Sequence, residues 1–179
     1  ETANLGVQAA LTGHLVFSTL HTNNAATCLP RLLDMGIEPF LIASTVRAVV
    51  GQRLVRRLCM TCREQYTPTS DEIKAHFSSF AINDDYMKNL HKLETEAQSQ
   101  GVGGDTPTGS TDTGIALLWK PSHDGCNDCR GTGYNGRVGI YEVLANSLTV
   151  QKLIMNNSTS AQIQAQAVTE GMVTMQTDG

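Results

Sequence analysis

Hydrophobic and polar residues recur with two different periods along the first third of the chain, and each period predicts an element. Residues 1–11 have apolar and small side chains at helical spacing, which predicts a helix. The short β-branched and aromatic run at residues 14–20 is typical of a buried strand. Asn23 is then a suitable N-cap for a helix that reaches about Met35, with Pro30 marking either a kink in this helix or its true start.

The alternation of elements continues up to the first cysteine pair. Pro39 to about Val50 places apolar residues at helical spacing, and residues 52–58 return to a strand-like pattern. Helix, strand, helix, helix, strand is the order of an α/β layered domain. Because the opening helix has no strand before it, we expect the beginning of that domain to lie upstream of Glu1.

The middle of the chain, residues 67–123, is polar and differs from the sequence on either side. Residues 71–98 predict an amphipathic helical insert, and residues 99–114, rich in glycine, serine and threonine, predict a flexible linker. One strand and two helices are expected after the insert, at 138–144, 149–156 and 160–170.

The charge of the chain is unevenly distributed. Residues 1–63 carry six arginines and three acidic side chains, whereas residues 64–121 carry four lysines and nine acidic side chains. Such sign changes mark module boundaries, and the net charge of −4 disfavours a nucleic-acid-binding protein. No apolar run approaches the roughly 20 residues of a membrane span, so we expect any membrane contact to be peripheral.

Four of the five cysteines form two C-x-x-C pairs, Cys59 with Cys62 and Cys126 with Cys129. Two thiolates at this spacing reach one metal ion from a tight turn, and two such turns close a tetrahedral Cys₄ zinc site. Glycines after the second pair are suited to aiming backbone N–H groups at the sulfurs. A structural zinc site in a reducing compartment is therefore favoured over a redox motif or buried thiols, while Cys28 lies at an apolar helical position and is expected in the core.

His21 and Thr22 follow the predicted strand, at the edge of a sheet where ligands of α/β domains bind. A histidine there could contact a terminal phosphate, although spacing alone favours a histidine that merely bonds a loop carbonyl, and a structural role for His14. Residues 131–136 match G-x-G-x-x-G but follow a cysteine pair rather than a strand. No G-x-x-x-x-G-K-[ST] motif occurs, so the chain by itself is not expected to hold nucleotide phosphates.

The chain resembles the type II secretion and type IV pilus assembly ATPase family from the end of its Walker B region onwards. The resemblance covers residues 1–66 and 124–179 and is absent from residues 67–123. Besides the two cysteine pairs, the matching segments are residues 12–23 (TGHLVFSTLHTN, the histidine box), 31–40 (RLLDMGIEPF), 52–59 (QRLVRRLC), 133–140 (GYNGRVGI) and 170–172 (EGM).

This resemblance implies a RecA-like P-loop ATPase domain that works in a homo-hexameric ring with ATP and Mg²⁺. It implies His21 and His14 as catalytic residues, and His21 and Thr22 as nucleotide-binding residues. It also implies a structural Zn²⁺ on the four paired cysteines, inner-membrane platform proteins as partners, no nucleic acid, and a cytoplasmic location peripheral to the inner membrane. The phosphate-binding loop, the Walker B glutamate and the arginine fingers are expected upstream of Glu1, so the chain alone is expected to be inactive.

The predicted organisation has three parts. Residues 1–58 are expected to be the C-terminal part of the RecA-like domain, residues 59–136 the zinc module interrupted by the insert, and residues 137–179 a small, mainly helical C-terminal domain. Two alternatives stay open. One is a non-enzymatic zinc-binding interaction module similar to the cysteine repeats of J-domain co-chaperones, and the other is a zinc-ribbon nucleic-acid binder, which the acidic insert disfavours.

Overall fold

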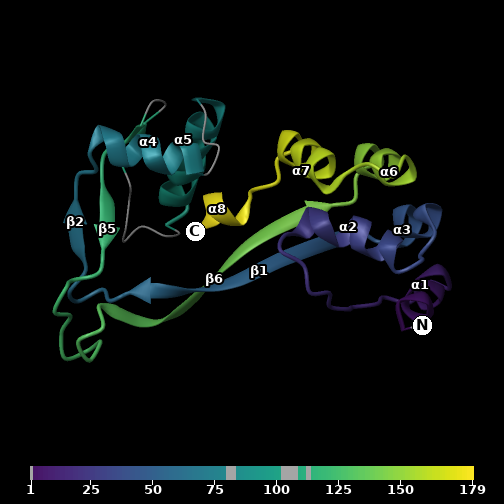
Figure 1. Ribbon diagram of the computed structural model, residues 1–179, viewed down its shortest axis with the longest axis horizontal. Coiled ribbons are helices and arrows are strands. Elements are labelled where there is room, and N and C mark those ends of the chain that lie inside the picture. Colours follow the sequence, from purple (N-terminus) through teal and green to yellow (C-terminus); the bar gives the residue numbers. More distant parts are fainter. Residues whose placement is uncertain (1, 80–83, 102–108, 112–113) are drawn as a thin grey trace. The chain divides into compact units, whose positions relative to one another are not determined.

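The computed structural model describes all residues except 1, 80–83, 102–108 and 112–113 (Figure 1). The described chain is a mixture of helices and strands in two compact units, of which the first holds Glu1–Leu54 and Gly139–Gly179 and the second holds Val55–Val138. Two long strands, β1 (Ala48–Leu58) and β6 (Tyr134–Ala145), form a two-stranded sheet (Figure 1). The boundary between the units falls within each of these strands.

Within the described residues, the first unit contains the three helices that precede β1 in the sequence and the three that follow β6. These helices are α1 (Thr2–Leu11), α2 (Ala25–Asp34), α3 (Pro39–Thr45), α6 (Leu148–Met155), α7 (Ser160–Thr169) and α8 (Met175–Asp178). Their starts follow ordinary capping chemistry. For example, the Asn24 side chain accepts a hydrogen bond from the Thr27 N–H at 2.9 Å. The predicted helix after Asn23 is therefore confirmed with its cap one residue later, and Pro30 lies inside it.

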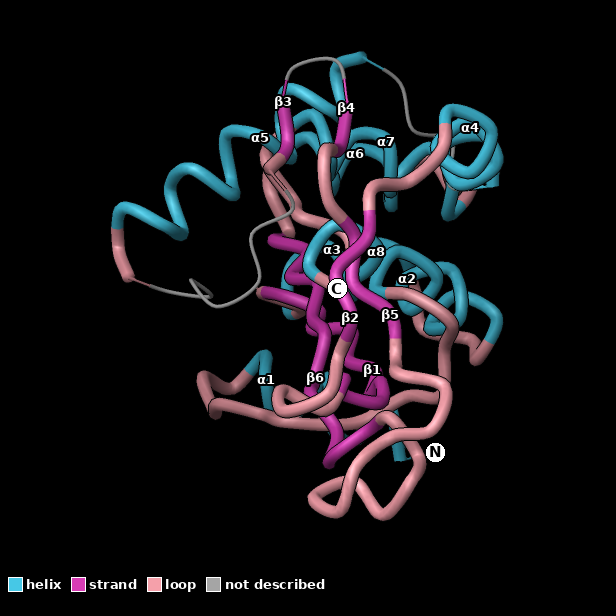
Figure 2. Tube along the Cα trace, turned by 90° about the vertical axis from the view of Figure 1, so that its left-hand side faces the viewer, coloured by secondary structure: helices cyan, strands magenta, loops and turns pink. Residues whose placement is uncertain are grey.

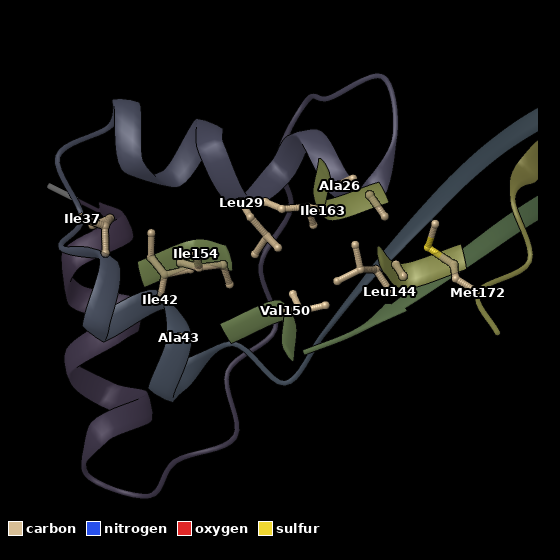
Figure 3. Packing of buried hydrophobic residues seen from close by; sticks show 12 residues of the cluster. Ala26, Leu29, Ile37, Ile42, Ala43, Leu144, Val150, Ile154, Ile163 and Met172 are labelled. Atoms are coloured by element: carbon tan, nitrogen blue, oxygen red, sulfur yellow. The ribbon is translucent and has the colours of Figure 1, made fainter. Parts of the chain in front are cut away.

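The apolar core of this unit lies where α2, α3, α6 and α7 meet the end of β6 (Figure 3). The side chains at its centre are at most 1% exposed, and the larger ones are Leu29, Ile42, Leu144, Val150, Ile154 and Ile163. Each such side chain stabilises the fold by about 1.5–3 kcal/mol relative to leaving it in water. The two helices predicted at 149–156 and 160–170 are confirmed as α6 and α7, because their apolar positions face this core.

Residues 14–20 do not form the buried strand that their composition predicts. No helix or strand is present there, and Leu15 and Phe17 are 80% and 87% exposed. β-Branched and aromatic residues favour strands because they pack against neighbours in a sheet, and the backbone of a strand needs a partner strand for its hydrogen bonds. No strand among the described residues pairs with this segment, so the prediction is wrong for this chain.

The helix predicted from Pro39 to about Val50 is shorter than expected. It ends at Thr45, and Val46 already has extended backbone angles, φ −69° and ψ 128°. β1 begins at Ala48 instead, four residues before the strand predicted at 52–58. The valines that match helical spacing here are β-branched and lose side-chain freedom in a helix, and they favour the strand that β6 pairs with.

The second unit contains the polar insert. Its elements are β2 (Glu64–Tyr66), α4 (Ser70–Ser79), α5 (Asp84–Ser99), β3 (Ser110–Thr111), β4 (Gly114–Ile115) and β5 (Leu118–Lys120). The prediction of a helical insert is confirmed by α4 and α5. Much of the predicted linker at 99–114 falls outside the described residues, but β3 and β4 pair at its end.

The insert leaves and returns through a short antiparallel pair, β2 with β5 (Figure 2). Glu64 lies opposite Lys120 and Tyr66 lies opposite Leu118, so the two ends of the insert are neighbours in the sheet. This pairing places the residues just before the insert beside residues near its C-terminal end. None of the helices within the described residues is both long and apolar enough to cross a membrane.

Candidate functional site

The four paired cysteines come together in the second unit. Cys59 and Cys62 lie in the turn that follows β1, and Cys126 and Cys129 lie in the turn before β6. Their sulfur atoms all lie within 4.8 Å of one another. Between the two pairs, the Sγ–Sγ distance is 3.7 Å for Cys59 and Cys126 and 3.8 Å for Cys62 and Cys129.

These distances fit a tetrahedral metal site. A zinc ion bound by four thiolates at about 2.3 Å places any two sulfurs about 3.8 Å apart, and a disulfide would need about 2.05 Å. All four thiols are free rather than paired in disulfides. The arrangement is therefore the donor set of a closed Cys₄ centre, which the spacing of the cysteines predicts. Its four positions would all be taken by protein, so it offers no open position for a substrate.

Backbone N–H groups point at one of the sulfurs. The N–H groups of Cys126 and Gly133 donate to the Cys129 sulfur at 3.1 and 3.2 Å. Gly133 has φ +72°, and a Cβ at this position would lie 2.7 Å from the Pro121 side chain. The prediction that glycines after the second cysteine pair aim N–H groups at sulfur is confirmed, since only glycine fits this position without strain.

Burial and hydrogen bonding shift the pKa values of the thiols in different directions. The backbone N–H of Cys126, followed by that of Gly133, lowers the pKa of Cys129 to about 6, although burial opposes this. Burial, followed by hydrogen bonding to Cys126, raises the pKa of Cys62 to about 12. Burial also acts to raise the pKa of Cys59, but the N–H groups of Thr61 and Cys62 outweigh it and the net shift is downward. A bound metal cation deprotonates its thiol ligands outright.

Contacts between the two turns hold the cysteine pairs in register. The Cys59 N–H donates to the Gly133 carbonyl at 2.9 Å, which ties the first turn to the strand that follows the second. The Thr61 hydroxyl donates to the Asp128 carboxylate at 2.7 Å. Both contacts join residues that belong to different C-x-x-C turns or their flanks, so part of the site is organised by the protein itself.

The histidines of the predicted nucleotide site lie in the first unit. Both are exposed: His14 begins the segment 14–20 for which a strand is predicted, and His21 directly follows that segment. His14 Nδ1 is 2.9 Å from the Thr12 hydroxyl. Thr22 is half-buried, and its hydroxyl donates to the Asn24 carbonyl at 3.0 Å. The catalytic and nucleotide-binding roles predicted for His21, His14 and Thr22 remain predictions.

A charged residue that the sequence patterns did not single out contacts the same segment. The Arg53 guanidinium on β1 donates to the backbone carbonyls of Thr22 and Asn23 at 2.8 and 3.3 Å. A small hollow of about 70 Å³ lies beside this contact, lined by Thr22, Asn24, Gln52 and Arg53 among others. Arg53 lies in the matching segment 52–59, at a strand position next to apolar residues, but neither feature reveals its partner.

The sequence of the whole chain is similar to that of known secretion and pilus assembly proteins. The family described as Type II/IV secretion system protein matches residues 1–179. The chain is 35% identical over 179 residues to the type IV pilus assembly ATPase PilB of Myxococcus xanthus, covering 100% of this chain and 26% of that protein. It is 38% identical over 179 residues to type II secretion system protein E of Dickeya dadantii, covering 100% of this chain and 28% of that protein.

A further relative is the type IV pilus assembly ATPase PilB of Pseudomonas aeruginosa. The chain is 36% identical to it over 179 residues, covering 100% of this chain and 26% of the relative. The chain thus spans about a quarter of the length of the curated relatives that it matches. These matches extend through residues 67–123, so the expectation that the resemblance is absent from the insert is wrong.

Proposed function

The chain belongs to the type II/IV secretion system protein family, and from this premise we propose that it is part of an ATPase that powers type II secretion or type IV pilus assembly. The observation that carries the proposal is the match along the whole chain to proteins that bear these names. In the whole protein, hydrolysis of ATP with Mg²⁺ would drive subunit motions that push a pilin-like subunit into a fibre. The protein would work as a homo-hexamer.

We propose further that residues 1–58 complete a RecA-like domain in the whole protein. The exposed apolar side chains of Leu15 and Phe17 support this, because a run of such residues is suited to a sheet interior. Residues 59–136 would be the zinc module, and residues 137–179 a small C-terminal domain.

The proposed chemistry is phosphoryl transfer to water, in which the protein positions the reactants and stabilises charge. His21 would contact the terminal phosphate, Thr22 would lie beside the nucleotide, and His14 would support the same site. No G-x-x-x-x-G-K-[ST] phosphate-binding loop occurs in residues 1–179, and we propose that the Walker B glutamate also lies outside them, so the chain alone is proposed to lack ATPase activity.

Cys59, Cys62, Cys126 and Cys129 would hold a structural Zn²⁺ that joins the two turns. The distances between sulfurs support this choice over a redox pair. The whole protein would be cytoplasmic and peripheral to the inner membrane, held there by platform proteins of the secretion or pilus machine. Nucleic acid is not a proposed partner, in keeping with the net charge of −4.

Titration with a non-hydrolysable ATP analogue tests this function. We expect the whole protein to bind the analogue in the presence of Mg²⁺, and the 179-residue chain to bind it weakly or not at all. Zinc content measured on the same samples shows whether each one is folded at the cysteine module. A whole protein that contains zinc but binds no nucleotide would favour the non-enzymatic interaction module instead.

A further inference from the structure

A buried carboxylate on β6 binds backbone groups from two separate helices. Glu142 is 3% exposed and lies among the residues of the first unit. One carboxylate oxygen, Oε1, accepts a hydrogen bond from the Ala25 N–H at 2.5 Å. The other, Oε2, accepts from the Met175 N–H at 3.3 Å. Glu142 therefore links the start of α2 to the start of α8.

Both N–H groups are the kind that a helix leaves unpaired. Ala25 and Met175 are the first residues of their helices, where backbone N–H groups have no partner within the helix. The capping side chains, Asn24 and Thr174, bond residues further along, Thr27 and Thr177. A negative charge beside the N-terminus of the ten-residue helix α2 is also favoured by the dipole of that helix.

The Glu142 side chain packs closely against Gly51 of the neighbouring strand β1. A Cβ built on Gly51 of β1 would lie 2.9 Å from Glu142 Cγ and 3.0 Å from Glu142 Oε1. Such distances are shorter than van der Waals contact, so any side chain at Gly51 would displace the carboxylate. Gly51 has no positive φ value, which means that close packing rather than backbone conformation requires glycine here.

The segment of residues 22–25 is thus bound by one acidic and one basic side chain from the two paired strands. Glu142 of β6 binds the N–H at Ala25, and Arg53 of β1 binds the carbonyls of Thr22 and Asn23. The 22–25 segment directly follows His21. These contacts hold its backbone together with two others: the Asn24 side-chain amide donates to the Gln164 side chain at 3.0 Å, and Ala25 is buried in the apolar core.

We propose that Glu142 is a positioning residue, which fixes the 22–25 segment and through it the placement of the adjacent His21 toward the terminal phosphate of the nucleotide. This inference rests on the proposed ATPase function. Glu142 itself touches no substrate in this account, and its effect on turnover is indirect. Misplacement of a reacting group by about 1 Å can lower a rate by about a hundredfold, so a loosened 22–25 segment should lower kcat.

The test uses the whole protein with Glu142→Gln, which keeps the size of the side chain and removes its charge. The amide offers one acceptor oxygen but turns an NH₂ group toward the second backbone N–H. We expect kcat for ATP hydrolysis to fall at least about tenfold. This threshold is lower than the roughly hundredfold loss that a misplacement of about 1 Å can cause, because the amide keeps one of the two hydrogen bonds. ADP affinity and zinc content should stay unchanged, because neither depends on a terminal phosphate. The matched control is Glu38→Gln. Glu38 is exposed at the start of α3, and its side chain makes no capping hydrogen bond.

A purely structural glutamate gives a different result. The thermal midpoint of Glu142→Gln would then fall while kcat per folded molecule stays within about threefold of the parent, and the proposal is overturned. Glu142→Asp, which keeps the charge but is too short to reach both helices, serves the same comparison if Glu142→Gln does not fold. If neither variant folds, Glu142 is structural and the inference is wrong.

The outcomes also separate this inference from the proposed function. An unmodified whole protein without ATPase activity contradicts the function itself. An active parent and an active Glu38→Gln variant, together with a fully active Glu142→Gln variant, contradict only the role of Glu142. A positioning role is supported when kcat falls and the affinity for ADP does not.

Discussion

Four sulfur atoms within 4.8 Å of one another are the most specific chemical feature of the chain. We predict that the purified chain binds about one zinc ion, and that Cys129→Ser lowers the zinc content to below half an ion per chain. The serine hydroxyl is a poor replacement for a thiolate at this metal. Because structural zinc contributes about 10 kcal/mol or more of apparent binding energy, its loss should also loosen the module.

The fifth cysteine provides the control for that measurement. Cys28 is buried in the first unit, and burial raises the pKa of its thiol. Cys28→Ala should keep the full zinc content and lose only packing. Metal analysis by mass spectrometry on both variants decides the matter. Equal zinc content in Cys129→Ser and the parent, or a disulfide within either cysteine pair, would show that these thiols do not form the site.

A third prediction concerns the role of His21 in ATP hydrolysis by the whole protein. In the whole protein, His21→Ala should lower kcat more than about tenfold, since the loss of one donor to developing charge costs about a hundredfold in well-studied enzymes. ADP affinity should change little because ADP has no terminal phosphate. His123→Ala, at an exposed position of the second unit, is the control. Steady-state turnover of His21→Ala within about threefold of the parent would assign His21 to a structural role.

Prediction from the sequence succeeded for residues whose chemistry is local. The cysteines were recognisable because a two-residue spacing within one turn already fixes how two ligands meet. Glu142 and Arg53 gave no comparable signal. Their partners lie 117 and 31 residues away in the sequence, and a lone charge on a strand does not reveal which backbone groups it binds.

At the scale of elements, helices with their own caps were the most predictable. α7 begins with a capping box, in which Thr159 and Gln162 bond each other's backbone N–H groups, and its sequence position was predicted closely. The segment at 14–20 was mispredicted for the opposite reason. A strand is stable only beside a partner, and the partner is a property of the fold rather than of the segment.

The capping box yields a stability prediction. Thr159→Ala should lower the free energy of unfolding by about 1 kcal/mol, the usual cost of removing a capping oxygen. Thr159→Asp should be nearly neutral, because aspartate supplies an equivalent acceptor at this position. Urea unfolding of the two variants checks this. If Thr159→Ala is as stable as Thr159→Asp, the capping contact at the Gln162 N–H is not contributing to stability.

At the scale of the whole molecule, the polar insert lies between the two cysteine pairs and lengthens the segment that joins them. The β2–β5 pair closes the base of the insert, with Tyr66 opposite Leu118. We predict that replacing residues 67–117 with an Asn-Gly turn leaves a hairpin that still binds about one zinc ion per chain. Two-residue Asn-Gly connections suit antiparallel strands of this kind.

Trp119, the only tryptophan of the chain, reports on this hairpin. The Arg63 guanidinium lies 4.2 Å from the centre of its ring, next to the first cysteine pair. The fluorescence of Trp119 in the shortened protein should change on metal removal in the same way as in the parent. Loss of zinc on shortening would mean that the insert itself, and not only its paired ends, organises the four cysteines.

The division into modules was predictable from the sequence only in part. The change of sign in charge and the polar composition located the insert, because both are properties of the segment itself. The two-unit arrangement was not predictable, since residues 139–179 belong to one unit with residues 1–54 through contacts that no local pattern records. Leu144 and Val150, for instance, pack in the same core as Leu29 and Ile42.

The central claim is that this chain is part of a secretion or pilus assembly ATPase. Magnesium-dependent ATP hydrolysis, measured side by side for the whole protein and the 179-residue chain, tests it most directly. The account predicts clear turnover by the whole protein and none above background by the chain, with zinc present in both. A whole protein that is folded and zinc-loaded but does not hydrolyse ATP, or a chain that turns over ATP by itself, would contradict it.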